Sequence, residues 1–535
     1  MLFNSNAFLF VFLPAVLAVC FAAHRALGLR AALASLFAAS LFFYGWWNPA
    51  YVGLILGSIA LNFGVARRIE SSADATRRKH WLYLGVAADL ALLGYFKYAN
   101  FFVENLAVWT GSAVDWVHVT LPIAISFFTF QQIAFLVDTH RGERSGGGLL
   151  EYALFVSFFP QLIAGPIVHH RELIPQLSDA RALRGSAQNL AVGSTIFFVG
   201  LFKKVVIADT MATFATPIFS AADAGATPVM IDAWGAALSY TFQIYFDFSG
   251  YSDMAIGLAR MFGLQLPTNF ESPYKAASIV DFWRRWHITL SRFLRVYLYI
   301  PLGGNRRGRS RRYANLWLTM LLGGLWHGAG WNFALWGGLH GGYLIVNHLW
   351  RSWRPAGPSS GRSRALRHAA CVALTFSVTV VAWVPFRAET HDGSQRILSA
   401  MFAPQSLGDH EDLARWTALS KAPDGPDAPR RVDLSDFERS SWRFWILEPF
   451  DVELGGFPWI VLCCALVWLF PNTRQWMADY EPGIDTTAGV AHRAPLLPIR
   501  RWRPNLAWSV PVAILAFASI VAVQGKLSEF IYFQF

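Results

Sequence analysis

A histidine inside a strongly apolar stretch is the first candidate for chemistry. His327 lies in the sequence GGLWHGAGWN, between segments rich in Leu, Trp and Gly. An ionisable side chain within a membrane segment is costly to keep and indicates a functional site by default. A neutral imidazole can accept the proton of an alcohol while that alcohol attacks an activated acyl group. Gly323 and Gly324 precede His327, and they either clear space beside the ring or permit tight helix packing.

A second histidine, His287, lies in the basic, tryptophan-rich segment DFWRRWHITLSRFLRVYLY. At helical spacing it shares one face with Trp283, Leu290 and Leu294, which predicts a basic amphipathic helix at the membrane surface. In that position His287 could orient a substrate, relay a proton or lie at the headgroup boundary. The later histidines His340 and His348 are expected to be structural.

The loop PLGGNRRGRSRR combines glycines with arginines and is a candidate for binding an anionic donor. Gly303, Gly304 and Arg306, with Arg284 and Arg285 before them, could hold a phosphorylated group, because backbone amides and guanidinium groups bind anions. The alternative is that these arginines only reflect the positive bias of cytoplasmic loops.

Other catalytic patterns are missing from the sequence. It contains no G-x-S-x-G nucleophile elbow, no H-E-x-x-H zinc helix and no P-loop. No histidine has an aspartate five residues later, the spacing that glycerolipid acyltransferases use. The cysteines lie in apolar runs without metal-ligand or disulfide spacing, and we expect them to be packing residues: Cys20, Cys371, Cys463 and Cys464. No metal site and no resident cofactor are predicted.

The elements that must position these histidines are membrane helices. Hydrophobic residues make up 54% of the chain and charged residues 15%, whereas soluble proteins have about 25% charged residues. Apolar blocks of spanning length without strand-like alternation predict an all-α polytopic membrane protein, with roughly 11–13 membrane helices including re-entrant segments.

The net charge of +11 lies largely in short loops, which the positive-inside bias explains better than nucleic-acid binding. The first apolar stretch lacks a basic leader and is predicted to be a span.

The whole chain, 1–535, is predicted to form one integral-membrane domain with its catalytic core at about 121–350. Within this core, 150–168 carries Pro160, Gly165 and basic flanks on both sides, which favours a bent or re-entrant segment. A polar insert at about 403–455 is expected to lie outside the cytoplasm.

Two further features of the core carry predictions. The apolar segments on either side of GAGWN are expected to form a hairpin with both ends on the cytoplasmic side and His327 near the middle of the bilayer. Asp247 and Asp253 lie within or beside an apolar helix. Asp253 could pair with a nearby arginine or line a cavity, and the alternative is a buried helix-end or interhelical polar contact.

The two histidine segments also carry a family resemblance. FWRRWHITLSRFLRVYLYIPLGGNRRG followed by GGLWHGAGWNFALWGGLHG resembles the membrane-bound O-acyltransferase family, specifically its bacterial alginate O-acetyltransferase branch. SFFPQLIAGPIVHHRELIPQL, GLFKKVVIADT, QIYFDFSGYSDMAIGLARMFG and the terminal FIYFQF agree with it. The resemblance implies a helical fold around a central tunnel, with the catalytic histidine at His327 and a second characteristic histidine at His287. The sequence departs from the family at Val296, where an acid is usual, and at His169, where the branch often has arginine.

This resemblance implies a reaction and its partners. An acetyl group would pass from a cytoplasmic thioester donor, expected to be acetyl-CoA, across the bacterial inner membrane. An extracytoplasmic acetyltransferase partner would place it on an exopolysaccharide such as alginate. Acylation of peptidoglycan or cellulose and D-alanylation of teichoic acid are alternatives within the family. A polysaccharide or lipid transporter without chemistry, or a scaffold of a secretion complex, would belong to other classes.

Overall fold

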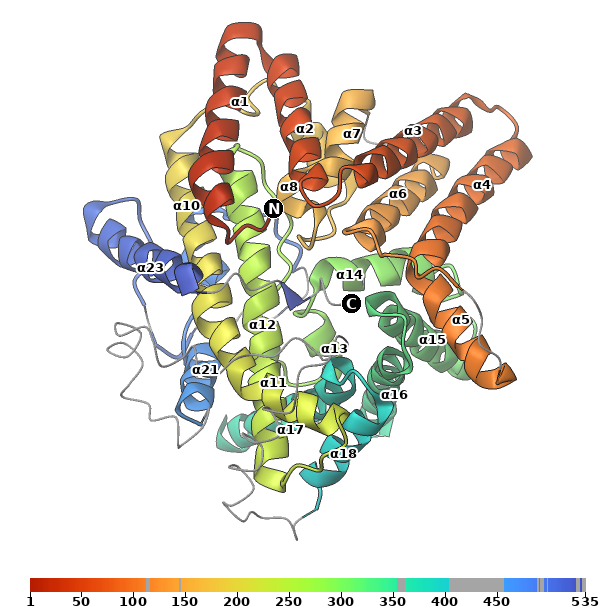
Figure 1. Cartoon of the computed structure of the whole chain (residues 1–535), viewed down its shortest axis with the longest axis vertical. Coiled ribbons are helices and arrows are strands. Elements are labelled where there is room, and N and C mark those ends of the chain that lie inside the picture. Colours follow the sequence, from red (N-terminus) through yellow and green to blue (C-terminus); the bar gives the residue numbers. More distant parts are fainter. Residues whose placement is uncertain are drawn as a thin grey trace.

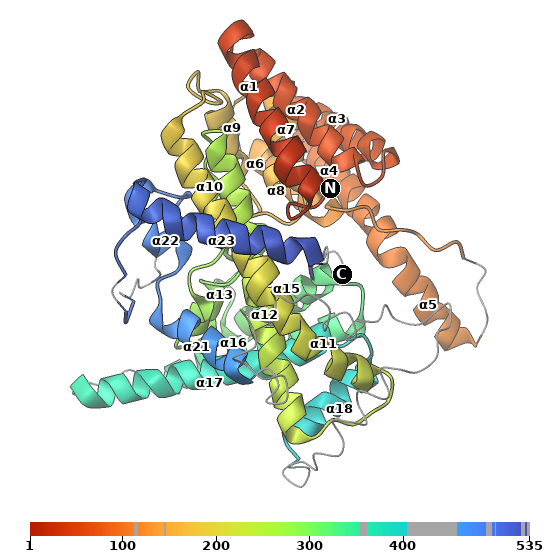
Figure 2. The same ribbon diagram turned by 60° about the vertical axis from the view of Figure 1, so that its left-hand side comes forward.

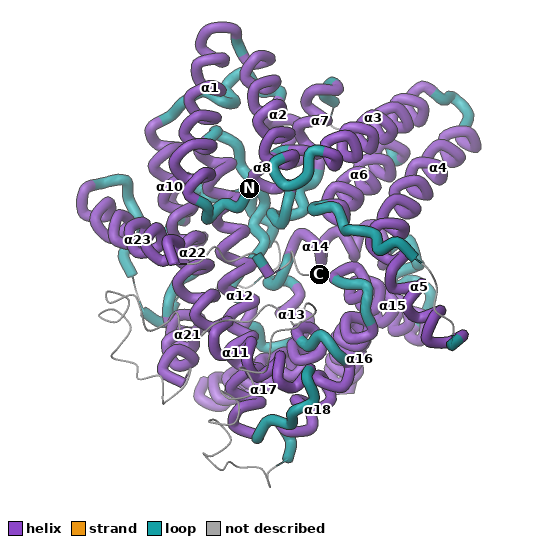
Figure 3. The backbone as a smooth tube through the Cα atoms, in the orientation of Figure 1, coloured by secondary structure: helices purple, strands orange, loops and turns teal. Residues whose placement is uncertain are grey.

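A long helix, α12 (Met230–Met261), forms the centre of the molecule (Figure 1). Three other long helices pack against it: α10 (Ala187–Phe202), α11 (Asp209–Asp223) and α17 (Gly361–Arg387). The computed structural model describes residues 1–111, 116–143, 146–353, 361–403, 457–487, 490, 495–497, 499–525 and 530–531. These residues form helices and loops without a strand (Figure 3), which confirms the predicted all-α class.

The N-terminal third consists of helical hairpins beside this centre. Its elements are η1 (Ala7–Phe12), α1 (Leu13–Leu27), α2 (Leu29–Gly45), α3 (Ala50–Ser71), α4 (Ala75–Leu93), η2 (Gly94–Tyr98), α5 (Ala99–Thr110), α6 (Ile125–His140), α7 (Leu149–Ser157), α8 (Phe159–Leu162) and α9 (His170–Leu177). Gly28 ends α1 with a φ of 84°, a conformation that glycine adopts at little cost, so the chain turns directly into α2.

The rest of the described chain surrounds the two histidine segments and closes the fold. Its elements are η3 (Lys203–Ala208), η4 (Pro273–Lys275), α13 (Ile279–Trp283), α14 (Ile288–Phe293), η5 (Leu294–Tyr299), α15 (Arg309–His327), α16 (Trp331–Trp353), α18 (His391–Met401), α21 (Phe457–Leu469), α22 (Thr473–Trp476), η9 (Ala478–Tyr480) and α23 (Leu506–Gly525). Figure 2 shows α17 and α5 extending outward from the body of the molecule.

Five helices in the described residues are long and apolar enough to cross a membrane. They are Ala7–Leu27, Ala50–Ser71, Ala187–Asp223, Gly361–Arg387 and Leu506–Gln524, and Leu29–Gly45 and Phe457–Leu469 are shorter apolar helices. The chain is therefore a multi-pass membrane protein, as predicted. Other segments expected to enter the membrane form elements that are shorter or less apolar, which is why they do not appear among these five.

The packing of α10 on α12 depends on two pairs of glycines. A Cβ atom on Gly193 would lie 2.6 Å from the carbonyl oxygen of Gly257, and one on Gly200 would lie 2.5 Å from that of Gly250. Any larger residue would push the two backbones apart, so these glycines permit the close approach of the helices.

The two aspartates of α12 make interhelical contacts, one of the alternatives open from the sequence, and their partners are lysines. Asp247 forms an ion pair of 2.8 Å with Lys204, and Asp253 forms one of 2.6 Å with Lys203. Asp247 also accepts a hydrogen bond of 3.1 Å from the backbone N–H of Ile531. The C-terminal segment is thereby attached to the centre of α12.

Two predictions about segments can be compared with the structure. The segment 150–168 is broken at Phe158, whose ψ of 108° separates α7 from α8, and this confirms the predicted bend. The polar insert at about 403–455 lies outside the described residues, apart from its first position.

Candidate active site

His327 is the last residue of α15, at the tip of the hairpin formed with α16. The chain turns through Gly328, Ala329 and Gly330 and re-enters a helix at Trp331. The predicted apolar hairpin is therefore present. The side chain of His327 is buried, with 4% of its residue surface exposed.

The glycines before His327 serve helix packing. A Cβ atom on Gly324 would lie 2.2 Å from the carbonyl oxygen of Phe333, and one on Gly337 would lie 2.4 Å from that of Met320. These backbones of α15 and α16 touch, so tight packing, one of the two alternatives from the sequence, explains Gly324. A Cβ atom on Gly323 would instead meet the side chain of Leu294 at 3.1 Å.

His287 does not lie on the apolar face of a continuous amphipathic helix, and that prediction was wrong. The helix ends at Trp283 with α13 and resumes at Ile288 with α14. Between them His287 has φ 42° and ψ 55°, the left-handed region that costs energy for a residue with a side chain. Periodicity could not reveal this break, because its cause is a partner distant in sequence.

That partner is Asn269. Its backbone carbonyl accepts a hydrogen bond from the N–H of Ile288 at 3.0 Å, and its side-chain oxygen lies 3.1 Å from Nδ1 of His287. The same oxygen accepts hydrogen bonds from the N–H of Thr289 at 3.3 Å and from its hydroxyl at 2.9 Å. An N–H can only donate, so this atom is the amide oxygen, and Nδ1 of His287 must carry the proton. In the neutral ring Nε2 is then a proton acceptor.

The fold brings the two predicted histidines together. The ring centroids of His287 and His327 lie 6.4 Å apart, although the residues belong to different segments. Nε2 of His287 is buried and has no hydrogen-bond partner among the described residues. Aromatic rings enclose His327 at centroid distances of 4.9 to 5.2 Å, contributed by Trp326, Trp336 and Phe386. The surroundings exclude water and keep an imidazole ready to accept a proton.

The residues predicted to bind the donor have different environments. Arg284 and Arg306 are exposed, whereas Arg285 is buried, 3.1 Å from a carboxylate oxygen of Asp281. The N–H of Gly303 donates to Ile300 at 3.0 Å and that of Gly304 donates to Tyr299 at 2.9 Å. The N–H groups of Gly303 and Gly304 are therefore hydrogen-bonded to the preceding helical turn. Donor binding at these five positions remains a prediction.

The histidines expected to be structural lie on α16. Nδ1 of His348 lies 2.8 Å from the guanidinium of Arg312. His340 is completely buried and its ring packs on that of Trp336 at 4.8 Å. Because Trp336 also contacts His327, His340 belongs to the wall of the site.

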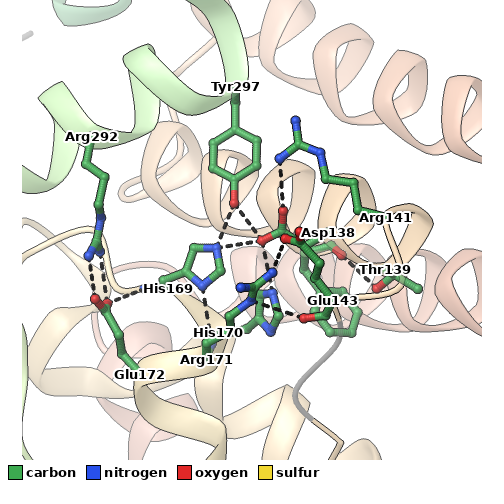
Figure 4. A network of polar contacts seen from close by, with 11 residues as sticks. Asp138, Thr139, Arg141, Glu143, His169, His170, Arg171, Glu172, Arg292 and Tyr297 are labelled. Atoms are coloured by element: carbon green, nitrogen blue, oxygen red, sulfur yellow. Dashed lines mark hydrogen bonds and ion pairs between the residues drawn. The ribbon is translucent and has the colours of Figure 1, made fainter. Parts of the chain in front are cut away.

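A cluster of polar residues lies beside α14 (Figure 4). The sequence analysis did not predict that these residues come together. One carboxylate oxygen of Asp138 lies 2.6 Å from Nε2 of His169, 3.2 Å from Nε2 of His170 and 2.7 Å from the hydroxyl of Tyr297. Nδ1 of His169 accepts the N–H of Arg171 at 3.3 Å. The proton of a neutral His169 ring is therefore on Nε2, which donates to this cluster.

These hydrogen bonds set the ionisation state of Asp138, which lies near the end of α6 and outside the candidate spans. Burial raises the pKa of the Asp138 carboxyl group, but hydrogen bonds from His169, His170 and Tyr297 outweigh it and lower the pKa below its usual range. Burial lowers the pKa of His170. The cluster thus holds a carboxylate surrounded by donors.

A pocket of about 320 Å³ opens beside the cluster. Arg141, Arg171 and Arg292 line it. Arg292 pairs with Glu172, and Arg171 pairs with Glu143. The two positions at which the sequence departs from the family pattern, His169 and Val296, both line this pocket, as does Thr289 beside the histidine pair.

Sequence reasoning missed Asn269 and the Asp138 cluster. Asn269 precedes His287 by 18 residues and lies in a loop, where no spacing rule connects the two. Asp138, His169 and Tyr297 lie in three separate segments. Only the tertiary structure brings them together.

Comparisons with known proteins identify several bacterial acyltransferases as relatives of this chain. The peptidoglycan O-acetyltransferase of Helicobacter pylori is 45% identical over 435 residues, covering 75% of this chain and 80% of that protein. The probable alginate O-acetylase of Azotobacter vinelandii is 38% identical over 555 aligned positions, covering 100% of both chains. The teichoic acid D-alanyltransferase of Streptococcus thermophilus is 25% identical over 43% of this chain and 57% of that protein.

A family model matches residues 93–366, the part of the chain that contains the Asp138 cluster, both histidines and the α15–α16 hairpin. The matched residues therefore include the site that the structure assembles from distant segments. With this match and relatives that align over the whole chain, the chain belongs to the membrane-bound O-acyltransferase family.

Proposed function

We propose that this acyltransferase moves an acetyl group from cytoplasmic acetyl-CoA across the bacterial inner membrane for O-acetylation of an exopolysaccharide. The observation that carries the proposal is the pair of buried histidines, with ring centroids 6.4 Å apart, in a chain that aligns over its full length with probable alginate O-acetylases. The exopolysaccharide is alginate or a polymer like it.

The proposed chemistry is an acyl transfer. His327 accepts the proton of an acceptor hydroxyl while the oxygen attacks the carbonyl carbon of the thioester. A C–O bond forms, the C–S bond breaks, and the imidazolium returns the proton to the departing thiolate. His287 supports this step, because its Nε2 is an acceptor held in place through Nδ1 by Asn269.

The donor and the final acceptor are on opposite sides of the membrane in this proposal. Arg284 and Arg306 are exposed, and in this proposal their guanidinium groups bind the phosphates of acetyl-CoA on the cytoplasmic side. An extracytoplasmic acetyltransferase partner receives the acetyl group and transfers it to the polymer.

The experiment compares cells that produce the wild type, His327→Gln or His391→Gln at equal membrane levels. His391 is exposed on α18 and serves as the matched control. Ester-bound acetate is measured in the secreted polysaccharide. We expect it to be lost with His327→Gln and retained with His391→Gln, while polymer export continues. Unchanged acetylation would refute the catalytic assignment, and lost export of unmodified polymer would indicate a transporter.

A second acceptor is favoured by one comparison. The peptidoglycan O-acetyltransferase of Helicobacter pylori shares 45% identity with this chain, so peptidoglycan is the alternative polymer. Measuring ester-bound acetate in purified peptidoglycan from the same cells separates the two. A loss confined to peptidoglycan in His327→Gln cells would replace the exopolysaccharide proposal.

A further inference from the structure

Two neighbouring side chains bind the C-terminal end of the helix that carries His327. The hydroxyl of Tyr98 donates to the carbonyl of Leu325 at 2.8 Å. The ammonium of Lys97 lies 2.5 Å from the carbonyl oxygen of Trp326 and 3.1 Å from that of His327. Both side chains belong to η2, and Lys97 precedes Trp326 by 229 residues. Three consecutive carbonyls at the end of α15 thus have side-chain donors from a distant element.

The end of α15 needs such donors. The last carbonyls of a helix have no partner inside the helix, and many helices satisfy them by a turn through a left-handed glycine. Gly328 is instead extended, with φ −157° and ψ 148°, so the chain leaves the helix without folding back over it.

The hydrogen bonds of Lys97 are directed to this helix end. Its acceptors in the described chain are the two carbonyls and the hydroxyl of Ser126, 3.5 Å away, and no carboxylate is among them. Its ammonium also lies 5.9 Å from the centroid of the Trp326 ring. A lysine side chain can donate several hydrogen bonds at once, so Lys97 restrains the carbonyl groups on both sides of His327.

We propose that Lys97 is a positioning residue for His327, which fixes the backbone of that residue and so the direction of its imidazole towards His287. The inference rests on the acyl transfer proposed above. The turn after His327 consists of Gly328, Ala329 and Gly330, none of which has a polar side chain that could bind the end of α15. Without Lys97 the end of α15 can shift, and a displacement of about 1 Å can reduce a catalytic rate by about 100-fold.

The test uses the full-length protein in detergent, with acetyl-CoA as the donor, an oligosaccharide with free hydroxyl groups as the acceptor, and thiol release that depends on this acceptor as the readout. Lys97→Met removes the amine and all three of its hydrogen bonds at similar side-chain volume. We expect kcat to fall by about 10- to 100-fold, with KM for acetyl-CoA changed less than twofold. Lys97→Arg retains a charged donor and is expected to recover most of the rate.

A matched control separates positioning from general stability. Lys275 donates to the backbone carbonyl of Phe470 at 3.0 Å, so Lys275→Met removes the same kind of bond away from His327 and should leave kcat unchanged. Tyr98→Phe removes the bond to Leu325, two residues before His327, and should lower kcat by only a few-fold. Thermal unfolding of each variant shows whether it is folded.

The outcomes distinguish this inference from the proposed function. If wild type and His327→Gln release thiol at the same rate, the acyl-transfer proposal fails. If they differ and folded Lys97→Met has the wild-type kcat, the positioning role of Lys97 is refuted. If Lys97→Met does not fold, the test uses Lys97→Arg and Tyr98→Phe instead. Wild-type kcat in Tyr98→Phe, together with no activity in folded Lys97→Arg, would refute a positioning role for a hydrogen-bond donor at position 97.

Discussion

Asn269 binds Nδ1 of His287 through its amide oxygen at 3.1 Å, and this contact determines which nitrogen of His287 can accept a proton. The same amide oxygen accepts two hydrogen bonds from Thr289. Thr289 in turn lines the pocket beside the Asp138 cluster and accepts the N–H of Ile167 at 3.0 Å. The loop containing Asn269 therefore determines both the left-handed backbone of His287 and the tautomer of its ring.

Replacing Asn269 by alanine should impair catalysis by freeing the His287 ring. Because Asn269→Ala removes the acceptor for Nδ1, the ring can rotate or change tautomer, and we expect kcat for thiol release to fall by about 10-fold. Ser252→Ala is the matched control, since it removes only the 3.3 Å contact at the amide nitrogen of Asn269. An equal loss of rate in both variants would contradict the role assigned to the amide oxygen.

The two glycines before His327 should differ in their tolerance of a methyl group. In Gly324→Ala the new Cβ atom would lie 2.2 Å from a backbone oxygen of α16, so the helices must separate at a cost of about 1–3 kcal/mol. In Gly323→Ala it meets the Leu294 side chain at 3.1 Å, which can move. Thermal unfolding in detergent should show a clearly lower Tm for Gly324→Ala alone. Similar Tm values in the two variants would show that the α15–α16 contact accommodates a methyl group at Gly324.

The features predicted from the sequence are those encoded locally. Apolar blocks revealed the multi-pass helical class, and Pro160 and Gly165 revealed the broken segment at 150–168. His327 was recognisable because a histidine in an apolar hairpin is unusual. GAGWN indicated the turn at which α15 ends.

The features that could not be predicted depend on contacts between distant segments. Helical periodicity predicted one helix through His287, but the Asn269 loop binds the backbone there and breaks it. No sequence pattern singles out Lys97, and only the folded chain shows it at the end of α15. A sequence pattern records the neighbours of a residue along the chain and not those across the fold.

Lys204 should be essential for stability. It is 4% exposed and lies 2.8 Å from a carboxylate oxygen of Asp247 and 2.7 Å from one of Asp209. Lys204→Met leaves these acids without their shared cation, and removing one partner of a buried pair costs about 3–5 kcal/mol. Thermal unfolding should therefore show a large fall in Tm.

An exposed ion pair provides the comparison for Lys204. Arg501 pairs with Asp479, and their side chains are 61% and 37% exposed. Exposed pairs contribute about 0–1 kcal/mol, so Arg501→Met should change Tm little. A fall as large as that of Lys204→Met would show that charge loss, and not burial, determines the effect.

The Asp138 cluster should respond weakly to metal ions, although a carboxylate and two imidazoles converge there. Ligand atoms of Asp138, His169 and His170 lie within 4.8 Å of one another. A metal ion needs an unprotonated nitrogen, yet Nδ1 of His169 accepts the N–H of Arg171, which leaves the ring proton on Nε2. Binding zinc through Nε2 would place a ring N–H against a backbone N–H. We therefore expect zinc at micromolar concentration, or its removal with EDTA, to leave Tm unchanged.

The same experiment can refute the proton assignment. His169→Gln removes the imidazole and serves as the control for zinc bound at other sites. A rise in Tm with zinc in the wild type, lost in His169→Gln, would mean that the His169 ring changes tautomer and coordinates the ion. With no zinc effect in either protein, the cluster acts through hydrogen bonds: Asp138 accepts from three donors and thereby connects α6, the start of α9 and η5 beside the pocket.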